Sequence, residues 1–551
     1  MNWLDYTIII AYIAFFLGMG YFFKENKNSK DYFLGGKSLG WFPLSLSTMA
    51  TQLSAISFIS APAFVGLKMG GGMKWLTFEF AVPLAMIFIM IVVVPPLFRS
   101  GVVSIYEVVE KRFSTSTRLI LSIVFQISRA LGTGVMVYTI AIILQAVLDI
   151  DFVYTILIIS IITIIYSWQG GMKAVVWGDA IQMIILVVGL GICLFIGWNL
   201  LQEKGGLPQG FEPQRLEVMN WNLGLGEGNE YGFLPMLIGG FFLYTSYYGC
   251  DQTQAQRLLS SKDEGTIRKL LLANGLLRFP VVLVYCIMGL IIGGLVSISP
   301  DFLSDIGAMT QKHFPLDYQQ NGLKADLMIP VFIIKYLPNG LIGVLMVGIL
   351  SAAMSTLSST INSLSAVTVE DLFNRGVQKD KMSTSKYMLL SKIAVVFWGA
   401  VCIGCAFLFG GSKSAVIEII NAISSVFYGP VLVTFILAFF SKKVNHIGMN
   451  IGILTAVLIN LIFSKTIQEL FHIDLGIHIF WIWLNFTGVI IALLVAYVVS
   501  AFTKQVRINS LNAMDFSLKV SDFKTKEVYI LLFFFVLILV FSFFLPSLLS
   551  F

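Results

Sequence analysis

The chain has 551 residues, of which 57% are hydrophobic and only 12% are charged. So much apolar surface excludes an array of soluble domains and predicts a chain embedded in a lipid bilayer. The net charge of +6 is small, and we expect no nucleic-acid partner and no obligate protein partner.

About fourteen segments are apolar over the roughly 20 residues that a membrane-spanning helix needs. They are residues 4–23, 41–66, 75–98, 119–147, 152–168, 175–201, 232–249, 268–298, 328–365, 389–410, 413–440, 447–464, 478–502 and 527–549. Because lipid offers the backbone no hydrogen-bond partners, we predict an all-α membrane protein in which these segments are transmembrane helices. The first has neither a basic segment before it nor an A-x-A cleavage site, so we expect it to be retained.

Lys and Arg gather in alternate connections between these segments. The richest are 24–40, 99–118, 250–269, 366–388 and 503–526. The positive-inside rule places them in the cytoplasm and therefore predicts that the N- and C-termini lie outside. The polar connections 202–231 and 299–327 are then outer loops. We expect one transmembrane domain, residues 1–551, in the cell (inner) membrane.

The second span contains MATQLSAISFISAPAFVG, from Met49 to Gly66, with Thr, Gln and three serines. A helix of this composition tends to break, and a break frees carbonyl groups that can bind a cation. A simple kink at Pro62 is the alternative.

Four ionisable residues fall inside predicted spans: Glu79, Arg129, Asp179 and Arg278. Burying a charge in lipid costs a few kcal/mol on insertion scales, so each is a candidate functional residue. Asp179 and Arg278 have the alternative of reaching the inner interface, and Arg129 has that of a structural pair with a carboxylate.

A second break is predicted between Ile238 and Gln252, opened by Gly239 and Gly240. Two interrupted helices, five spans apart, are typical of inverted-repeat transporters. We expect repeats at 41–201 and 232–464, the latter with its flanking loops and the first later helix. The extra helices are then 4–23 at the N-terminus and 478–551 at the C-terminus. The tyrosines of this stretch belong either to an interfacial belt or to a solute pocket.

Small polar side chains form a stripe on one face of the ninth span. Its members are Ser351, Ser355, Ser358, Ser359 and Asn362. Such residues let helices pack closely, but packing does not require hydroxyl groups on one line. The stripe therefore favours a site for an alkali cation.

Six sequence motifs follow one another along the chain in a recognisable order. They are DYFLGGKS (Asp31 to Ser38), ATQLSAISF, GGMKAVVWGDAIQ (Gly170 to Gln182), DQTQAQR (Asp251 to Arg257), SAAMSTLSSTINS and YGPVLVTFILAFFSKK (Tyr428 to Lys443). With them the chain resembles the sodium:solute symporter family, which includes sodium/glucose cotransporters and bacterial galactose and sialic acid transporters. SSTINSLSAVTVEDL is also similar to the branch that carries monocarboxylates, vitamins and iodide.

The resemblance implies a LeuT-like core and Na⁺ as the coupling ion. It places one sodium on the carbonyl groups of Ala50, Leu53 and Ala352 and on the hydroxyl groups of Ser355 and Thr356. Asp179, Ser358 and Ser359, together with Ser355, match the positions that hold a second sodium in the sialic acid relatives.

The same resemblance implies a solute pocket. Its expected residues are Ser54, Ser57, Glu79, Arg129, Tyr247, Arg278 and Asn421. The solute-binding Arg of the sialic acid relatives aligns with Gly132, about one turn from Arg129. A carboxylate, a carboxamide and a cation suit a polyhydroxy solute. We therefore predict a sodium-coupled symporter of a monosaccharide or sugar derivative. A symporter of a small anion is the alternative, through Arg129, Arg278 and the vitamin-branch motif.

Two other classes of membrane protein are less compatible with the sequence. A channel is disfavoured because no pore loop repeats along the chain. We expect no enzyme, since no nucleophile, base or metal-ligand cluster is visible.

Overall fold

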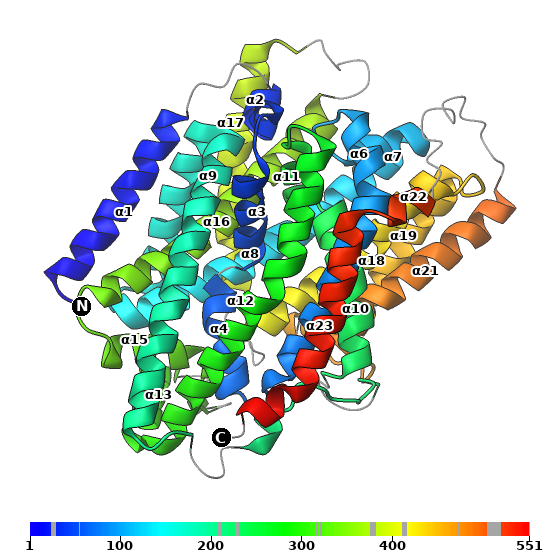
Figure 1. Cartoon of the computed structure of the whole chain (residues 1–551). Helices are drawn as coiled ribbons and strands as arrows, with labels where there is room; N and C mark the ends of the chain where they lie inside the picture. The colour runs from blue at the N-terminus through cyan, green and yellow to red at the C-terminus, as the bar shows by residue number, and fades with distance from the viewer. Residues whose placement is uncertain are drawn as a thin grey trace.

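The computed structural model describes residues 1–23, 29–53, 55–207, 212–225, 231–315, 318–319, 322–374, 382–409, 416–471, 473–503 and 520–549. Within these ranges the protein is built of helices (Figure 1). Ordinary α-helices carry the labels α1 to α23. They are α1 (Trp3–Phe22), α2 (Ser29–Leu34), α3 (Trp41–Gln52), α4 (Ala55–Gly66), α5 (Ala81–Phe88), α6 (Val94–Ser100), α7 (Tyr106–Arg112), α8 (Thr115–Leu148), α9 (Phe152–Glu203), α10 (Phe233–Cys250), α11 (Gln252–Leu259), α12 (Glu264–Ile298), α13 (Pro300–His313), α15 (Met328–Tyr336), α16 (Leu341–Val367), α17 (Thr384–Ala406), α18 (Val416–Phe440), α19 (His446–Phe463), α20 (Lys465–Leu470), α21 (Trp481–Phe502), α22 (Val520–Phe523) and α23 (Lys526–Leu549).

Over the described part of the chain, 11 helices are long and apolar enough to cross a membrane, or up to 12 if α3 and α4 form one span. The predicted all-helical membrane architecture is confirmed, whereas the number fourteen is not. One reason is that α9 covers two of the predicted segments. They are separated inside it by Gly171, whose backbone (φ 56°, ψ −153°) is one that residues with side chains rarely adopt.

The second span is broken as predicted. Helix α3 ends at Gln52, and the segment Ile56–Gly66 is bent by 52° from it. Pro62 lies within α4, several residues beyond the break, so the alternative of a proline kink is wrong.

The second predicted break lies within the predicted range, Ile238 to Gln252, but Gly239 and Gly240 do not open it. Helix α10 continues through Gly239 and Gly240 to Cys250. Gly239 instead permits close packing, because a Cβ atom there would lie 2.4 Å from the carbonyl oxygen of Ile482 in α21. The helix is interrupted at Asp251, which is extended (φ −96°, ψ 128°) and caps α11 by accepting a 2.8 Å hydrogen bond from the Thr253 amide.

Two further boundaries differ from the prediction. The expected span 328–365 is divided into α15 and α16 by an extended Leu337, a conformation that the following Pro338 favours. The expected outer loop 299–327 contains α13, which has a proline at its first helical position.

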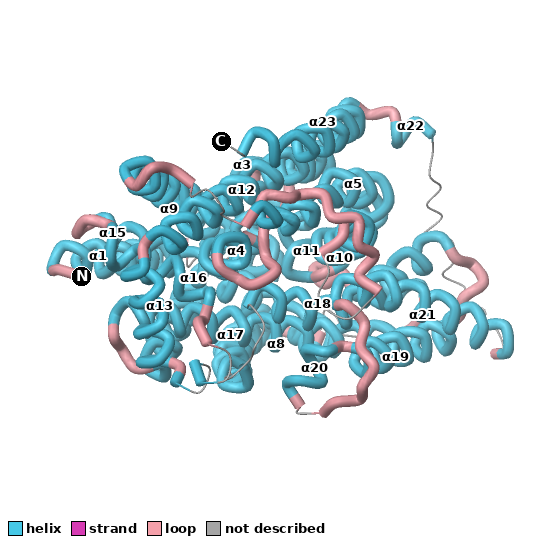
Figure 2. Tube along the Cα trace, turned by 90° about the horizontal axis from the view of Figure 1, so that it is seen from below, coloured by secondary structure: helices cyan, strands magenta, loops and turns pink. Residues whose placement is uncertain are grey.

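Helix α16 forms the buried centre of the molecule. Nearly every residue from Ser351 to Val367 is buried, and the helix packs against α9, α1, α8 and α17. Seen from below, α1 and α21 lie at opposite edges of the bundle (Figure 2). The two termini lie in the lower half of Figure 1, and the short helices α2, α7 and α22 lie in its upper half. Which end faces the cytoplasm stays a prediction from the Lys and Arg distribution.

Candidate functional site

A carboxylate at the centre of the molecule connects three helices. Asp179, on α9, is completely buried. Its Oδ2 accepts a 2.6 Å hydrogen bond from Ser47 of α3, and its Oδ1 accepts one of 2.7 Å from Ser355 of α16. Ser359, one turn further along α16, donates to Oδ2 over 3.1 Å. Asp179 therefore does not reach the inner interface.

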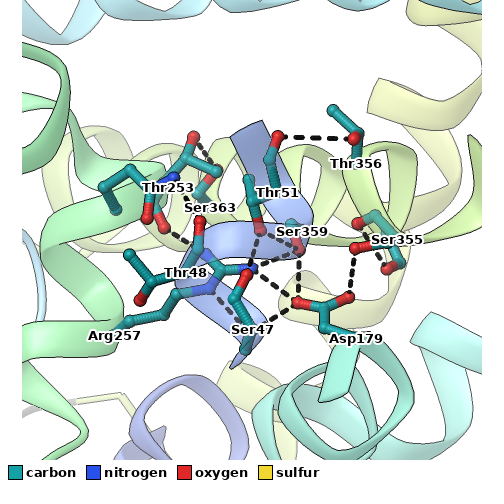
Figure 3. A network of polar contacts seen from close by, with 12 residues as sticks. Ser47, Thr48, Thr51, Asp179, Thr253, Arg257, Ser355, Thr356, Ser359 and Ser363 are labelled. Carbon is teal, nitrogen blue, oxygen red and sulfur yellow. Dashed lines mark hydrogen bonds and ion pairs between the residues drawn. The ribbon is translucent and has the colours of Figure 1, made fainter. Parts of the chain in front are cut away.

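An arginine neutralises this carboxylate (Figure 3). The Arg257 Nη2 lies 2.8 Å from Asp179 Oδ2, and its Nε donates to Ser47 Oγ over 2.8 Å. Nη2 also contacts Ser359, and only 1% of the Arg257 side chain is exposed. The pattern of apolar segments in the sequence singles out neither Ser47 nor Arg257. The only signal for Arg257 is its place at the end of the DQTQAQR motif.

The residues expected to hold the first sodium lie where α3 ends beside α16. The Thr356 hydroxyl lies 3.3 Å from the Ala352 carbonyl oxygen and 3.4 Å from that of Thr51. Ala50 and Leu53 belong to the end of α3, where the last carbonyl groups have no partner within the helix. Neutral oxygen atoms of this kind suit a hard cation such as Na⁺.

The other expected sodium ligands are already engaged with the protein. The Ser355 and Ser359 hydroxyl groups bond to Asp179. The Ser358 hydroxyl donates to the Ser355 carbonyl oxygen over 3.0 Å and lies 3.4 Å from the Tyr166 hydroxyl. Ser355 and Ser359 thus join α16 to Asp179 of α9, whereas the Asn362 side chain has no hydrogen-bond partner among the described residues.

A separate cavity of about 100 Å³ adjoins this region. Its lining includes Thr51 and Thr356, which connect it to the end of α3. It also includes six of the predicted solute residues, namely Ser57, Glu79, Arg129, Tyr247, Arg278 and Asn421. The seventh, Ser54, lies outside the described residues.

Glu79 and Arg278 form a buried ion pair in the wall of this cavity. Arg278 Nε lies 2.8 Å from Glu79 Oε2, and Nη2 lies 3.2 Å from Oε1, which also accepts a 3.0 Å hydrogen bond from Tyr244. The Arg278 side chain is 7% exposed, so the alternative that it reaches the inner interface is wrong. Its Nη1 has no hydrogen-bond partner among the described residues.

Arg129 pairs with a carboxylate, as one alternative predicted. Its Nε lies 2.6 Å from Asp251 Oδ2, at the interruption between α10 and α11. The guanidinium group also contacts the Tyr428 hydroxyl and lies over the Tyr247 ring, 4.8 Å from its centre. Asp251 and Tyr428 stand in the motifs DQTQAQR and YGPVLVTF, although nothing local in the sequence indicates that they meet Arg129.

Known proteins resemble this chain in sequence and in fold. The profile of the sodium:solute symporter family matches residues 32–456. Sodium-coupled monocarboxylate transporter 1 of Xenopus laevis is 29% identical over 470 residues, which cover 83% of this chain and 71% of that protein. The sodium/sialic acid symporter SiaT of Proteus mirabilis is 26% identical over 481 residues, which cover 83% of this chain and 88% of that protein.

Among solved structures, a substrate-bound, outward-open Na⁺-coupled sialic acid symporter is similar in fold. The TM-score is 0.75 at 20% identity, over 91% of this chain and 98% of that one. The all-helical arrangement is thus that of LeuT-like transporters.

Proposed function

Because the chain belongs to the sodium:solute symporter family, we propose that it imports a small organic anion of the monocarboxylate type. Members of this family are transporters rather than enzymes, and Na⁺ is the coupling ion. We place the protein in the cell (inner) membrane, with the Lys- and Arg-rich connections in the cytoplasm. We also assign the inverted repeats to residues 41–201 and 232–464.

A buried guanidinium donor in the cavity wall carries the proposal, since each guanidinium group already has one carboxylate partner, Glu79 for Arg278 and Asp251 for Arg129. The residues that line the cavity include one carboxylate, Glu79, and two guanidinium groups, Arg129 and Arg278. The Nη1 of Arg278, which has no hydrogen-bond partner in the described part of the chain, is a buried donor whose desolvation a solute carboxylate would offset. The relatives named above carry monocarboxylates and sialic acid, which are anions.

A monosaccharide is the second candidate. Glu79 and Asn421 both line the cavity, and a carboxylate and a carboxamide can each bond to a pair of sugar hydroxyl groups. The ion pair with Arg278 weakens this candidate, because it already occupies both Glu79 oxygen atoms.

We assign the coupling ion to the end of α3. Na⁺ would lie between the carbonyl groups of Ala50, Leu53 and Ala352 and the hydroxyl groups of Ser355 and Thr356. Because Thr51 and Thr356 also line the solute cavity, ion binding and solute binding would order the same residues. A second Na⁺ would use Asp179, Ser355, Ser358 and Ser359, after the present hydrogen bonds rearrange.

Uptake by the purified protein in liposomes tests the function. With Na⁺ outside, labelled pyruvate should accumulate, and it should not do so when choline replaces Na⁺. Galactose and proline serve as comparison solutes in the same vesicles. Accumulation of galactose without pyruvate would overturn the anion proposal in favour of the second candidate. Equal transport in choline and Na⁺ would overturn sodium coupling.

Glu79→Gln separates the two candidates within one protein. It should abolish galactose uptake if a sugar is the solute, since the carboxylate would be its main partner. It should spare pyruvate uptake, because both guanidinium groups remain. The initial rates for the two solutes, compared with the unaltered protein, decide between them.

A further inference from the structure

One wall of the solute cavity separates it from a second, smaller void. The cavity is lined by Arg129, Tyr247 and Tyr428. A void of about 10 Å³ beyond them is lined by Tyr428, Asp251, Cys250 and residues of α8 and α18. Tyr428 borders both spaces, and the Arg129–Asp251 ion pair joins a residue of the first to a residue of the second. This pair and Tyr428 are therefore the partition between the two.

The smaller void lies beside the interruption between α10 and α11, since Cys250 and Asp251 line it. Helix α10 ends at Cys250, and α11 begins at Gln252 on the upper side of Figure 1. Movement at this interruption would open the smaller void toward the end of the molecule that carries the Lys- and Arg-rich connections, which we assign to the cytoplasm.

Each carboxylate oxygen atom of Asp251 has its own hydrogen-bond partner. Its Oδ1 caps α11 through the Thr253 amide, and its Oδ2 holds Arg129. Next to it, Ser246 of α10 donates to the Tyr428 carbonyl oxygen over 2.8 Å and ties α10 to α18. The Asp251 and Arg129 side chains are only 5% and 13% exposed, so little solvent screens the pair.

We propose that the Arg129–Asp251 pair is the inner barrier of the transport path and that the carboxylate of the solute opens it by competing with Asp251 for Arg129. The proposal rests on the proposed anion transport. An anion in the cavity offers a second carboxylate to the side of Arg129 that lines the cavity. As Arg129 turns to the solute, Asp251 and the interruption between α10 and α11 are released. A neutral solute has no charge with which to compete, so the pair also selects for anions.

Asp251→Asn tests the barrier without removing the helix cap. Asparagine is as good an N-cap as aspartate, but it lacks the negative charge that holds Arg129. The variant should bind pyruvate more tightly, by about fivefold or more in the presence of Na⁺, since coupling energies of this kind span roughly 5–150-fold. Asp251→Glu restores the charge and should bind pyruvate more nearly as the unaltered protein does. Asp305→Asn, which removes an exposed ion pair with Lys335, is the matched control and should change nothing.

Cys250 gives a readout that is independent of transport. It is buried and lines the smaller void. The other four cysteines (Cys193, Cys286, Cys402 and Cys405) are replaced by serine or alanine. In this background the rate of Cys250 alkylation by N-ethylmaleimide measures the opening of the partition. Asp251→Asn should speed alkylation without pyruvate. When Asp251 is kept in the same cysteine-replaced background, pyruvate with Na⁺ should speed the alkylation of Cys250 and galactose should not.

The outcomes separate the two proposals. Alkylation in Asp251→Asn that is no faster than in the control would overturn the barrier. Weaker pyruvate binding by Asp251→Asn would overturn the competition for Arg129. If the unaltered protein bound no pyruvate but bound galactose, the proposed function and the competition would both fall. The alkylation rate of Asp251→Asn would then still decide whether the pair is a barrier.

Discussion

At the scale of single residues, the proposed sodium sites depend on hydroxyl groups at the end of α3 and along α16. Ser355 lies between the two proposed sodium sites, because its hydroxyl bonds to Asp179 and its neighbour Thr356 faces α3. A serine on the same helix but away from this region, Ser365, bonds to its own backbone at Ile361 over 2.7 Å. These two residues have similar burial and different surroundings, so they make a matched pair.

Ser355→Ala should raise the Na⁺ concentration for half-maximal uptake by about tenfold or more, since a hydrogen bond or ligand bond to a charged group contributes roughly 1.5–3 kcal/mol. The measurement is the initial rate of pyruvate uptake against Na⁺ concentration. Ser365→Ala is the control and should leave the Na⁺ dependence as it is. The same half-maximal concentration in both variants would remove Ser355 from the sodium site.

Arg257 and Asp179 form a buried pair whose loss should be visible as stability. Removing one partner leaves an unpaired buried charge, which costs about 3–5 kcal/mol. Arg257→Gln and Asp179→Asn should each lower the melting temperature of the purified protein in detergent. The double variant should recover part of the loss, because neither charge then remains. A double variant less stable than both single variants would contradict this account of the pair.

At the scale of elements, interruptions of helices position the site. The break after Gln52 presents the end of α3 to α16, and the one at Asp251 places a carboxylate beside Arg129 in the wall of the solute cavity. The third interruption, at Gly171, turns the chain so that the second part of α9 carries Asp179 toward α3 and α16. Each interruption has a local cause: composition in α3, a capping aspartate before α11 and a glycine in α9.

Gly171→Ala should destabilise the protein by about 1–3 kcal/mol, the usual cost of such backbone strain. A Cβ atom there would also lie 2.7 Å from the Tyr32 carbonyl oxygen. A Cβ atom at Gly191, in the same helix, would have no neighbouring atom within 4 Å among the described residues, so Gly191→Ala should be neutral or slightly stabilising. Thermal unfolding of the two variants in detergent compares them. Equal melting temperatures would show that the turn at Gly171 tolerates a side chain.

At the scale of the whole molecule, the energy source is the sodium gradient and the membrane potential. A tenfold Na⁺ gradient supplies about 1.4 kcal/mol per ion, and 100 mV supplies about 2.3 kcal/mol per charge. One Na⁺ with a monovalent anion moves no net charge and gains nothing from the potential. The second Na⁺ proposed at Asp179 would make transport electrogenic.

Pyruvate uptake should therefore be faster when the interior of the vesicle is negative. A potassium diffusion potential set with valinomycin imposes the voltage at a fixed Na⁺ gradient, and vesicles without valinomycin are the control. Initial rates that do not respond to the potential would indicate one Na⁺ per anion and would exclude the second sodium site around Asp179.

The amino-acid sequence by itself determined the features that depend on local composition and periodicity. Apolar length gave the helices and the membrane, since a bilayer requires runs of about 20 residues. Thr, Gln and Ser inside a span located the break after Gln52, and the spacing of Ser355 and Ser359 placed their hydroxyl groups on one face of a helix.

Only the tertiary structure decided which of these groups meet. Arg257 and Asp179 are 78 residues apart and Arg129 and Asp251 are 122 apart. Such pairs leave no trace in local periodicity, because the packing of whole helices brings them together. The glycines of α10 illustrate the same point: Gly239 could have marked a break or a close contact, and the position of α21 made it a contact.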